Sequence, residues 1–213
     1  MNPFINIEEQ IDANLKLRGY TELTSIQKAI IEKEITGRDA IVSAQTGSGK
    51  TIAFGLSIVS NIPNNNKVKK PPSVLIIAPT RELALQVQNE LDWLYSKTSI
   101  CIVSCVGGMD MRTEKRNLKK FPDIILGTPG RLKDYLEREV INLSKIKVVV
   151  LDEADEMLNL GFRKELEYIL SQTPKEKRTL LFSATISKGI EKLASKYQNN
   201  ALRISTTRNN QQH

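Results

Sequence analysis

Short apolar runs rich in β-branched residues recur along the 213-residue chain and constrain its fold more than any other feature. Their apolar residues follow one another without alternation, which indicates strands that are covered on both faces. Segments with helical periodicity, such as 81–95 and 163–170, lie between the runs. Strand and helix in alternation predict an α/β fold with a mostly parallel sheet and helices on both faces. The runs are 40–43, 74–78, 100–104, 124–126, 148–151 and 179–182.

Composition and charge narrow the class of protein. Hydrophobic residues make up 40% of the chain, which is enough to build a core. No segment approaches the roughly 18 consecutive apolar residues of a membrane helix, and the first residues lack the pattern of a signal peptide. We therefore expect a cytoplasmic protein. The net charge of +7 is compatible with a polyanionic partner, but it is equally typical of a basic soluble protein.

The cysteines and the histidine exclude several chemistries. Cys101 and Cys105 would face the same side of one strand, where a disulfide is geometrically implausible, so we expect buried free thiols. The only histidine is His213. This excludes Ser-His-Asp and Cys-His catalysis and histidine-based zinc sites.

A glycine-rich loop follows the first apolar run and precedes a helical pattern. Gly47 and Gly49 allow the backbone to approach a ligand closely. Lys50 would reach the β- and γ-phosphates of a nucleotide, and Thr51 would offer its hydroxyl to Mg²⁺. A helix that starts near Gly49 would direct its amides at the anion. The whole loop predicts phosphate binding and reads Ala44, Gln45, Thr46, Gly47, Ser48, Gly49, Lys50 and Thr51.

An acidic cluster follows the run 148–151. A carboxylate at the end of a buried strand, here Asp152, suits the magnesium site that accompanies such a loop. Glu153 could then orient and deprotonate an attacking water molecule. We expect Asp155 to form hydrogen bonds with Ser183 or Thr185. The loop and the cluster together predict a nucleoside triphosphatase.

These residues resemble the DEAD-box RNA helicases, which are named for the sequence found here at 152–155. The resemblance covers nearly the whole chain, and its wording is closest to bacterial members. It implies a RecA-like P-loop domain. The matching segments are 19–27, 44–51, 79–83, 107–108, 128–131, 152–162 and 183–185.

For the nucleotide, the resemblance implies ATP with Mg²⁺. Gln27 looks like the glutamine that reads adenine, and we also expect Tyr20, in the same segment, to bind the nucleotide. Phe4 is the candidate for stacking on adenine, although it could instead be a hydrophobic anchor for the first helix. Ser183 and Thr185 resemble the motif that links the nucleotide site to RNA unwinding, and we group them with Lys50, Asp152 and Glu153 as catalytic.

For RNA, the resemblance implies contacts with the phosphate backbone and little base specificity. Arginine forks and helix N-termini at these positions suit phosphate. Thr80 and Thr128 could cap helices, contact RNA, or do both. The expected RNA-binding residues are Pro79, Thr80, Arg81, Gly107, Gly108, Thr128, Pro129, Gly130 and Arg131.

The resemblance also sets the expected domains. Residues 1–207 would be the N-terminal RecA-like domain, with a helical segment over 1–36, and 208–213 would begin the linker to a second domain that is missing. We expect this half to be a monomer that binds ATP but hydrolyses it poorly, and that binds RNA weakly. Two alternatives remain open at this point, a non-catalytic module that regulates a partner and a DNA-directed motor on the same fold.

Overall fold

The computed structural model describes residues 9–32, 35, 37–45, 47–63 and 70–205, so the expectations for Phe4, Thr46 and 208–213 lie outside the described residues. Its strands are β1 (Ala40–Ser43), β2 (Val74–Ile77), β3 (Ile102–Cys105), β4 (Ile124–Gly127), β5 (Val148–Leu151), β6 (Arg178–Ser183) and β7 (Leu202–Ser205). They form one seven-stranded sheet in the order β3-β4-β2-β5-β6-β1-β7. Every pairing is parallel, which confirms the predicted fold class.

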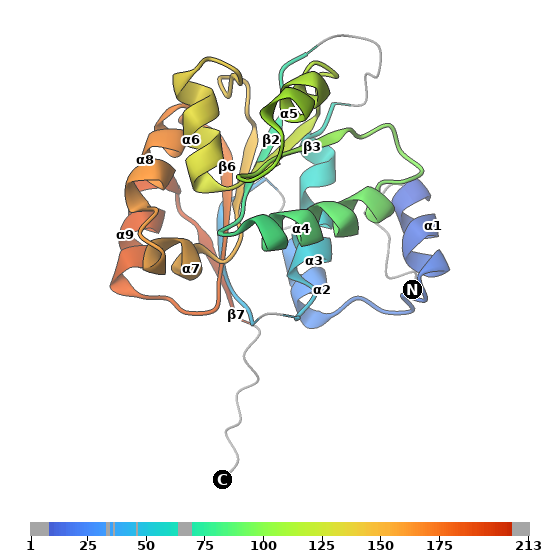
Figure 1. Cartoon of the computed structure of the whole chain (residues 1–213). Helices are drawn as coiled ribbons and strands as arrows, with labels where there is room; N and C mark the ends of the chain where they lie inside the picture. The colour runs from blue at the N-terminus through green and yellow to red at the C-terminus, as the bar shows by residue number, and fades with distance from the viewer. Residues whose placement is uncertain (1–8, 33–34, 36, 46, 64–69, 206–213) are drawn as a thin grey trace.

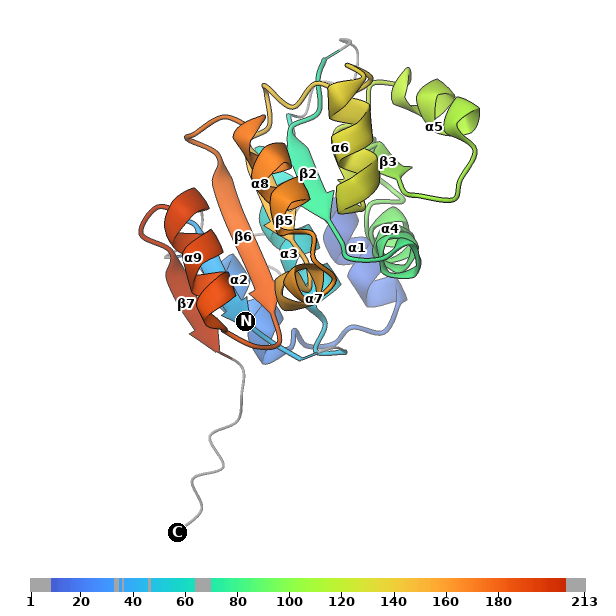
Figure 2. The same ribbon diagram turned by 60° about the vertical axis from the view of Figure 1, so that its left-hand side comes forward.

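Helices cover both faces of the sheet (Figures 1 and 2). They are α1 (Glu9–Leu17), α2 (Ser25–Ile31), α3 (Lys50–Ile58), α4 (Arg81–Leu94), α5 (Met111–Leu118), α6 (Pro129–Glu137), α7 (Ala154–Asn159), α8 (Arg163–Ser171) and α9 (Lys188–Tyr197), with a short 3₁₀ helix, η1 (Val59–Asn61). Helices α1 to α4 pack on one face and α6 to α9 on the other. Successive residues of a strand serve opposite faces, so Val74 and Ile76 join one core and Leu75 and Ile77 the other.

The six predicted runs are all strands, and the structure adds a seventh. Strand β3 begins at Ile102 and not at residue 100. Strand β7 was missed because it lies at the sheet edge, paired only with β1, and its residues alternate between half-buried and exposed. An alternating edge strand of four residues lacks the continuous apolar run that marked the other strands.

Helices α3 and α4 approach each other closely at Gly55. A Cβ atom there would lie 2.8 Å from the side chains of Leu91 and Leu94. The Tyr95 hydroxyl, at the end of α4, donates a hydrogen bond of 2.6 Å to the Gly55 carbonyl. Asn14 of α1 donates to the carbonyl of Leu94 at 3.0 Å. These contacts join three helices of this face into one packed unit.

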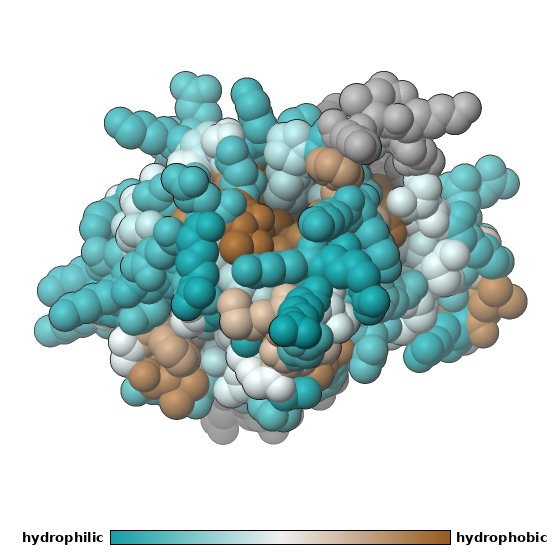
Figure 3. All heavy atoms as spheres, turned by 45° about the horizontal axis from the view of Figure 1, so that its top comes forward, coloured by the Kyte–Doolittle hydropathy of each residue, from teal (hydrophilic) through white to brown (hydrophobic). Residues whose placement is uncertain are grey.

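The face that Figure 3 shows is mostly hydrophilic. Seen partly from above, polar side chains dominate, and a hydrophobic area lies between α5 and α6 (Figure 3). Within the described part of the chain, every helix is too short or too polar to cross a bilayer. Both cysteines are free thiols as predicted, and Cys105 is buried. Cys101 differs from the prediction, because it precedes β3 and is only half-buried.

Candidate nucleotide and RNA site at the carboxyl ends of the strands

The phosphate loop continues directly from β1. The Ala44 amide donates to the Ser183 carbonyl at 3.1 Å, which extends the pairing of β1 with β6 beyond the strands. Gly47 and Gly49 have φ values of 80° and 83°, a left-handed conformation that glycine adopts at little cost. Gly49 is the N-cap of α3 and, lacking a side chain, makes no capping hydrogen bond. The first amides of α3 are therefore available to a phosphate group.

Gln27 contacts the phosphate loop directly. It is almost fully buried, and its side-chain oxygen accepts a hydrogen bond of 2.9 Å from the Thr24 amide. Its Nε2 donates to the Gly49 carbonyl at 3.3 Å, and the Thr24 hydroxyl donates to the Ser48 carbonyl at the same distance. A Cβ atom on Gly49 would lie 2.6 Å from Gln27 Nε2. The start of α2 and the phosphate loop thus hold each other in place.

The acidic cluster faces Lys50. The Lys50 Nζ lies 3.5 Å from Asp152 Oδ1 and 3.3 Å from Glu153 Oε1. Asp152 is 2% exposed, and burial raises its pKa to about 6 although Lys50 acts in the opposite direction. Glu153 has a φ of 50°, in the left-handed region that is strained for a residue with a side chain. Strain of this kind is often retained at functional sites.

The residues at this edge fit a magnesium ion. Asp152 Oδ1 is buried, and its one charged neighbour among the described residues is the Lys50 ammonium at 3.5 Å. Thr51 lies half-buried in the first turn of α3. The described residues contain no cluster of three His, Cys, Asp or Glu side chains that could enclose a metal. Mg²⁺ commonly takes one or two carboxylates together with substrate phosphates, which matches this donor set.

Asp155 connects α7 to the end of β6, as expected. Its Oδ2 accepts hydrogen bonds from the Thr185 amide at 3.0 Å and from the Thr185 hydroxyl at 2.9 Å. Burial acts to raise the pKa of Asp155, but hydrogen bonds from Thr185, Ser183 and the backbone outweigh it and hold the pKa below its usual range. The Ser183 hydroxyl also donates to the Thr185 carbonyl at 2.7 Å. The loop after β6 is therefore fixed to the acidic cluster.

Most of the predicted RNA-binding residues surround one open cavity of about 460 Å³. Thr80 caps α4 by accepting a hydrogen bond of 3.2 Å from the Leu83 amide. Thr128 is the N-cap of α6 but makes no capping hydrogen bond, so its hydroxyl is available to a ligand. The predicted residues that line the cavity are Pro79, Arg81, Gly107, Thr128, Gly130 and Arg131.

The two arginines of this set are held in different ways. Arg81 is exposed, and its Nη1 donates to the Gly108 carbonyl at 2.9 Å. The Arg131 Nη1 contacts the Glu114 carboxylate at 2.7 Å and the Tyr135 hydroxyl at 3.0 Å. Arg81 therefore links the start of α4 to the glycine doublet, whereas Arg131 belongs to a largely buried network with Glu114 and Tyr135.

A model of the DEAD/DEAH box helicase family matches residues 24–193, which is most of the chain and includes every predicted site residue except Phe4 and Tyr20. The chain belongs to this family. It is 42% identical over 195 residues to the ATP-dependent RNA helicase CshA of Limosilactobacillus reuteri, a match that covers 91% of this chain and 38% of that protein. The CshA of Listeria monocytogenes is 43% identical over 192 residues, with 90% and 36% covered.

Solved structures agree with this assignment. A DEAD box protein from the hyperthermophile Methanococcus jannaschii matches with a TM-score of 0.87 and 37% identity, over 94% of this chain and 54% of that one. A hypothetical ATP-dependent RNA helicase from Sulfolobus tokodaii matches with a TM-score of 0.85 and 32% identity, over 93% and 57%. The DEAD-box chain described here thus spans little more than a third of those curated relatives and just over half of those solved chains.

Sequence reasoning missed one residue of this DEAD-box site. Glu114 is 1% exposed, and its carboxylate accepts from Arg131, from the Tyr135 hydroxyl and, at 2.9 Å, from the Val106 amide next to the glycine doublet. The only local signal was a carboxylate within a strongly charged helix, which is the usual pattern of a solvated surface.

Tyr20 contacts helix α4 in the described structure. Its ring centroid is 6.0 Å from that of Trp93 on α4, in a tilted arrangement. It packs against the main core as a partly buried residue. The observed contact is therefore with α4, and a contact with adenine stays a prediction.

Proposed function

We propose that this protein is an ATP-dependent RNA helicase and that residues 1–207 form its N-terminal RecA-like domain. One observation carries the proposal. The Lys50 ammonium and the carboxylates of Asp152 and Glu153 converge within 3.5 Å at the end of the sheet that also carries the RNA cavity. A phosphate site and a polyanion site at the carboxyl ends of one sheet suit an enzyme that couples nucleotide hydrolysis to local RNA unwinding.

At the nucleotide, each residue has a separate task. Gln27 would read adenine while its hydrogen bond to Gly49 keeps the loop open for phosphate. Lys50 would turn from the carboxylates to the β- and γ-phosphates. Asp152 and Thr51 would hold Mg²⁺, which when bound neutralises charge on the phosphate oxygens. Glu153 would orient the attacking water and accept its proton.

At the RNA, the cavity residues would contact phosphates and sugars. Arg81 and the hydroxyl of Thr128 present donors, and Gly107 and Gly130 leave room for a backbone to approach. Such contacts position a strand but do not read its sequence, and they weaken as salt increases. The hydrogen bonds between Asp155 and Thr185 would couple this edge to the nucleotide.

We expect slow hydrolysis by this chain alone. An arginine that stabilises the transferring phosphoryl group contributes about 10³–10⁵ in rate. The two arginines of the cavity contact other parts of the domain through one Nη1 atom each, Arg81 at Gly108 and Arg131 at Glu114, and we assign neither of them to the nucleotide. We also propose that the chain is monomeric and acts in the cytoplasm, and that its arginine finger comes from a second RecA-like domain.

The test measures binding before turnover. Fluorescent ATP and GTP analogues are titrated with Mg²⁺ into the wild type, Gln27→Ala and the control Gln86→Ala, an exposed glutamine on α4. Preference for ATP that is lost only in Gln27→Ala supports the proposal, and equal binding of both nucleotides contradicts it. Competition between single-stranded RNA and DNA then separates RNA from DNA motors. RNA-stimulated turnover by this chain alone that is fast and abolished by Glu153→Gln would contradict the expected slow hydrolysis.

A further inference from the structure

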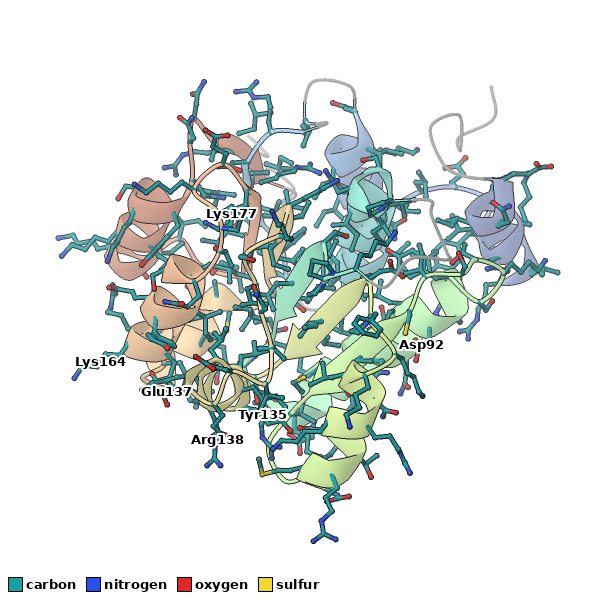
Figure 4. All side chains as sticks on the ribbon, turned by 90° about the horizontal axis from the view of Figure 1, so that it is seen from above. Asp92, Tyr135, Glu137, Arg138, Lys164 and Lys177 are labelled. Carbon is teal, nitrogen blue, oxygen red and sulfur yellow. The ribbon has the colours of Figure 1, made fainter. Side chains whose placement is uncertain are left out.

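A second cavity, of about 920 Å³, lies at the opposite end of the sheet from the phosphate loop. The loops before β1, β6 and β7 form it, together with the ends of α8 and α9. Figure 4 looks onto this end of the molecule and labels Lys177. Strand β6 has six residues, so about 20 Å separate the two ends of the sheet. Nothing in the proposed helicase reaction uses this cavity.

Its lining carries more basic than acidic residues. Its acidic residues are Asp39, Glu167 and Glu176, and Glu167 already pairs with Lys196 at 2.8 Å. Its basic residues are Arg38, Lys175, Lys177, Arg178 and Lys196.

Three of these charged residues are buried, two cations and one carboxylate. Asp39, Lys177 and Arg178 are 7%, 7% and 6% exposed. The Asp39 oxygens accept hydrogen bonds from the Thr179 amide at 2.6 Å and the Asn199 amide at 2.5 Å. One buried positive charge is therefore left without a matching carboxylate, an arrangement that is costly unless an anion compensates it.

Arg178 is satisfied by the fold itself. Its guanidinium donates to the carbonyls of Arg38, Ser57 and Ile35 at 2.7, 3.1 and 3.1 Å. These bonds tie the start of β6 to the segment before β1 and to the end of α3. The guanidinium is thus structural, and this leaves Lys177 as the buried cation with unused donors.

Lys177 has few partners for a buried ammonium. Its Nζ donates to the Pro174 carbonyl at 3.2 Å and lies 5.9 Å from the ring centroid of Tyr197. Across the described residues, none of the ion pairs within 4.0 Å involves Lys177. An ammonium carries three N–H donors, so two remain for a ligand. Burial also lowers the pKa of Lys177, and the Asp39 carboxylate acts in the opposite direction.

We propose that this cavity is a second anion site, in which the Lys177 ammonium binds a phosphate group. A phosphate oxygen would accept the free N–H donors of Lys177 and supply the missing negative charge. The exposed side chain of Lys175 at the rim adds attraction at longer range. The phosphate could belong to a free anion, to a mononucleotide or to an RNA strand.

The experiment maps phosphate binding by amide NMR on the whole chain, with inorganic phosphate titrated at constant ionic strength. We expect shifts at Thr179 and Asn199, separate from those of the phosphate loop. Lys177→Met should weaken the first set about tenfold or more, as for loss of a charge-assisted hydrogen bond. The exposed Lys192→Met is the matched control, and Lys50→Ala should weaken only the loop set. Absence of shifts at Thr179 and Asn199, or their persistence with unchanged affinity in Lys177→Met, would overturn the proposal.

A stability measurement separates this role from a structural one. Without phosphate, Lys177→Met should melt at or above the wild-type temperature, because it removes an uncompensated buried charge. Phosphate should then raise the melting temperature of Lys50→Ala but not of the Lys50→Ala, Lys177→Met double variant. A Lys177→Met protein that is less stable in every buffer, with the phosphate effect intact, would refute the anion site.

Further titrations identify the source of the phosphate. AMP and a short single-stranded RNA, with and without a 5′-phosphate, are compared at the Thr179 and Asn199 amides. Shifts from AMP or from the 5′-phosphorylated RNA alone indicate a terminal phosphate, and equal shifts from both RNAs indicate the backbone. Shifts from RNA with none from inorganic phosphate or AMP would contradict a site built for a single phosphate group. A negative result in any of these titrations does not affect the proposal of the ATP site, because that site is followed at the amides of the phosphate loop.

Discussion

Replacing Glu114 with alanine is expected to destabilise the protein by about 4 kcal/mol. The carboxylate is 1% exposed and accepts hydrogen bonds from Arg131, Tyr135 and Val106. Breaking a buried ion pair from one side costs about 3–5 kcal/mol. The Val106 amide, left without its acceptor, would add about 1–3 kcal/mol, and relaxation around the small alanine offsets part of that sum.

The assay is urea unfolding, followed by circular dichroism, with the midpoint and slope fitted for each variant. Glu191→Ala is the control, because that carboxylate makes two short contacts with Arg203, of 2.7 and 2.6 Å, on the exposed surface. Exposed pairs contribute about 0–1 kcal/mol. The burial of the network, and not the shortness of its contacts, therefore sets the expected difference between the two variants.

A second variant tests the reasoning about the pair itself. Glu114→Leu combined with Arg131→Met removes both charges, and it should recover most of the stability that Glu114→Ala loses. Two results would refute the argument. One is a loss of less than about 1 kcal/mol in Glu114→Ala. The other is a double variant whose loss equals the sum of its single variants, since residues in one network must couple.

Three further predictions concern the other features of the carboxyl edge and its core. Gly49→Ala should weaken ATP binding about tenfold or more, because its Cβ would meet Gln27 Nε2 at 2.6 Å. The control Gly37→Ala has a similar φ but open space around it, so it should lower stability without changing ATP affinity. Equal ATP affinities of the two variants in a fluorescence titration would contradict this prediction. Asp155→Ala should lower the free energy of unfolding in urea by about 1–3 kcal/mol, since it leaves the amide and hydroxyl of Thr185 without their acceptor. An unchanged urea midpoint would contradict this prediction. Burial raises the pKa of the Cys105 thiol to about 12, so alkylation of this thiol at pH 8 should require unfolding. The free energy of unfolding should fall as the pH rises from 9 toward 12, because in that range the thiol ionises easily only in the unfolded chain. Rapid labelling of Cys105 in the folded protein would exclude this account.

The candidate site at the carboxyl ends of the strands was predictable because its residues follow buried strands. Lys50 and Asp152 lie about a hundred residues apart in the sequence. Asp152 directly follows a strand of continuous apolar residues, and Lys50 follows another such strand after a short loop. Parallel strands bring their carboxyl ends to one side of a sheet, so the meeting of these residues follows from local pattern alone. Strand β7 shows the converse, since an edge strand with alternating burial leaves little local signal.

Contacts between distant, ordinary-looking residues could not be predicted in the same way. Glu114 lies in a helix whose sequence is dominated by charge, and its burial depends on Arg131 and Tyr135 from another helix. Lys177 and Arg178 belong to a basic run that resembles a solvated loop, but the packing of α9 and the segment before β1 encloses them. Partner choice across the fold is decided by tertiary packing, which no periodicity within one segment records.

The glycine at position 55 sets a limit on how the molecule can move. Helix α3 starts at the phosphate loop, and α4 starts at the cavity proposed to bind RNA. The two helices are in contact, with no room for a methyl group between them at Gly55. Packed interiors transmit displacement and do not absorb it. The distance between the two binding edges is therefore expected to stay constant through a catalytic cycle. Under the proposed helicase function, unwinding of RNA would then come from motion of this domain against another domain, and not from a change of shape within it.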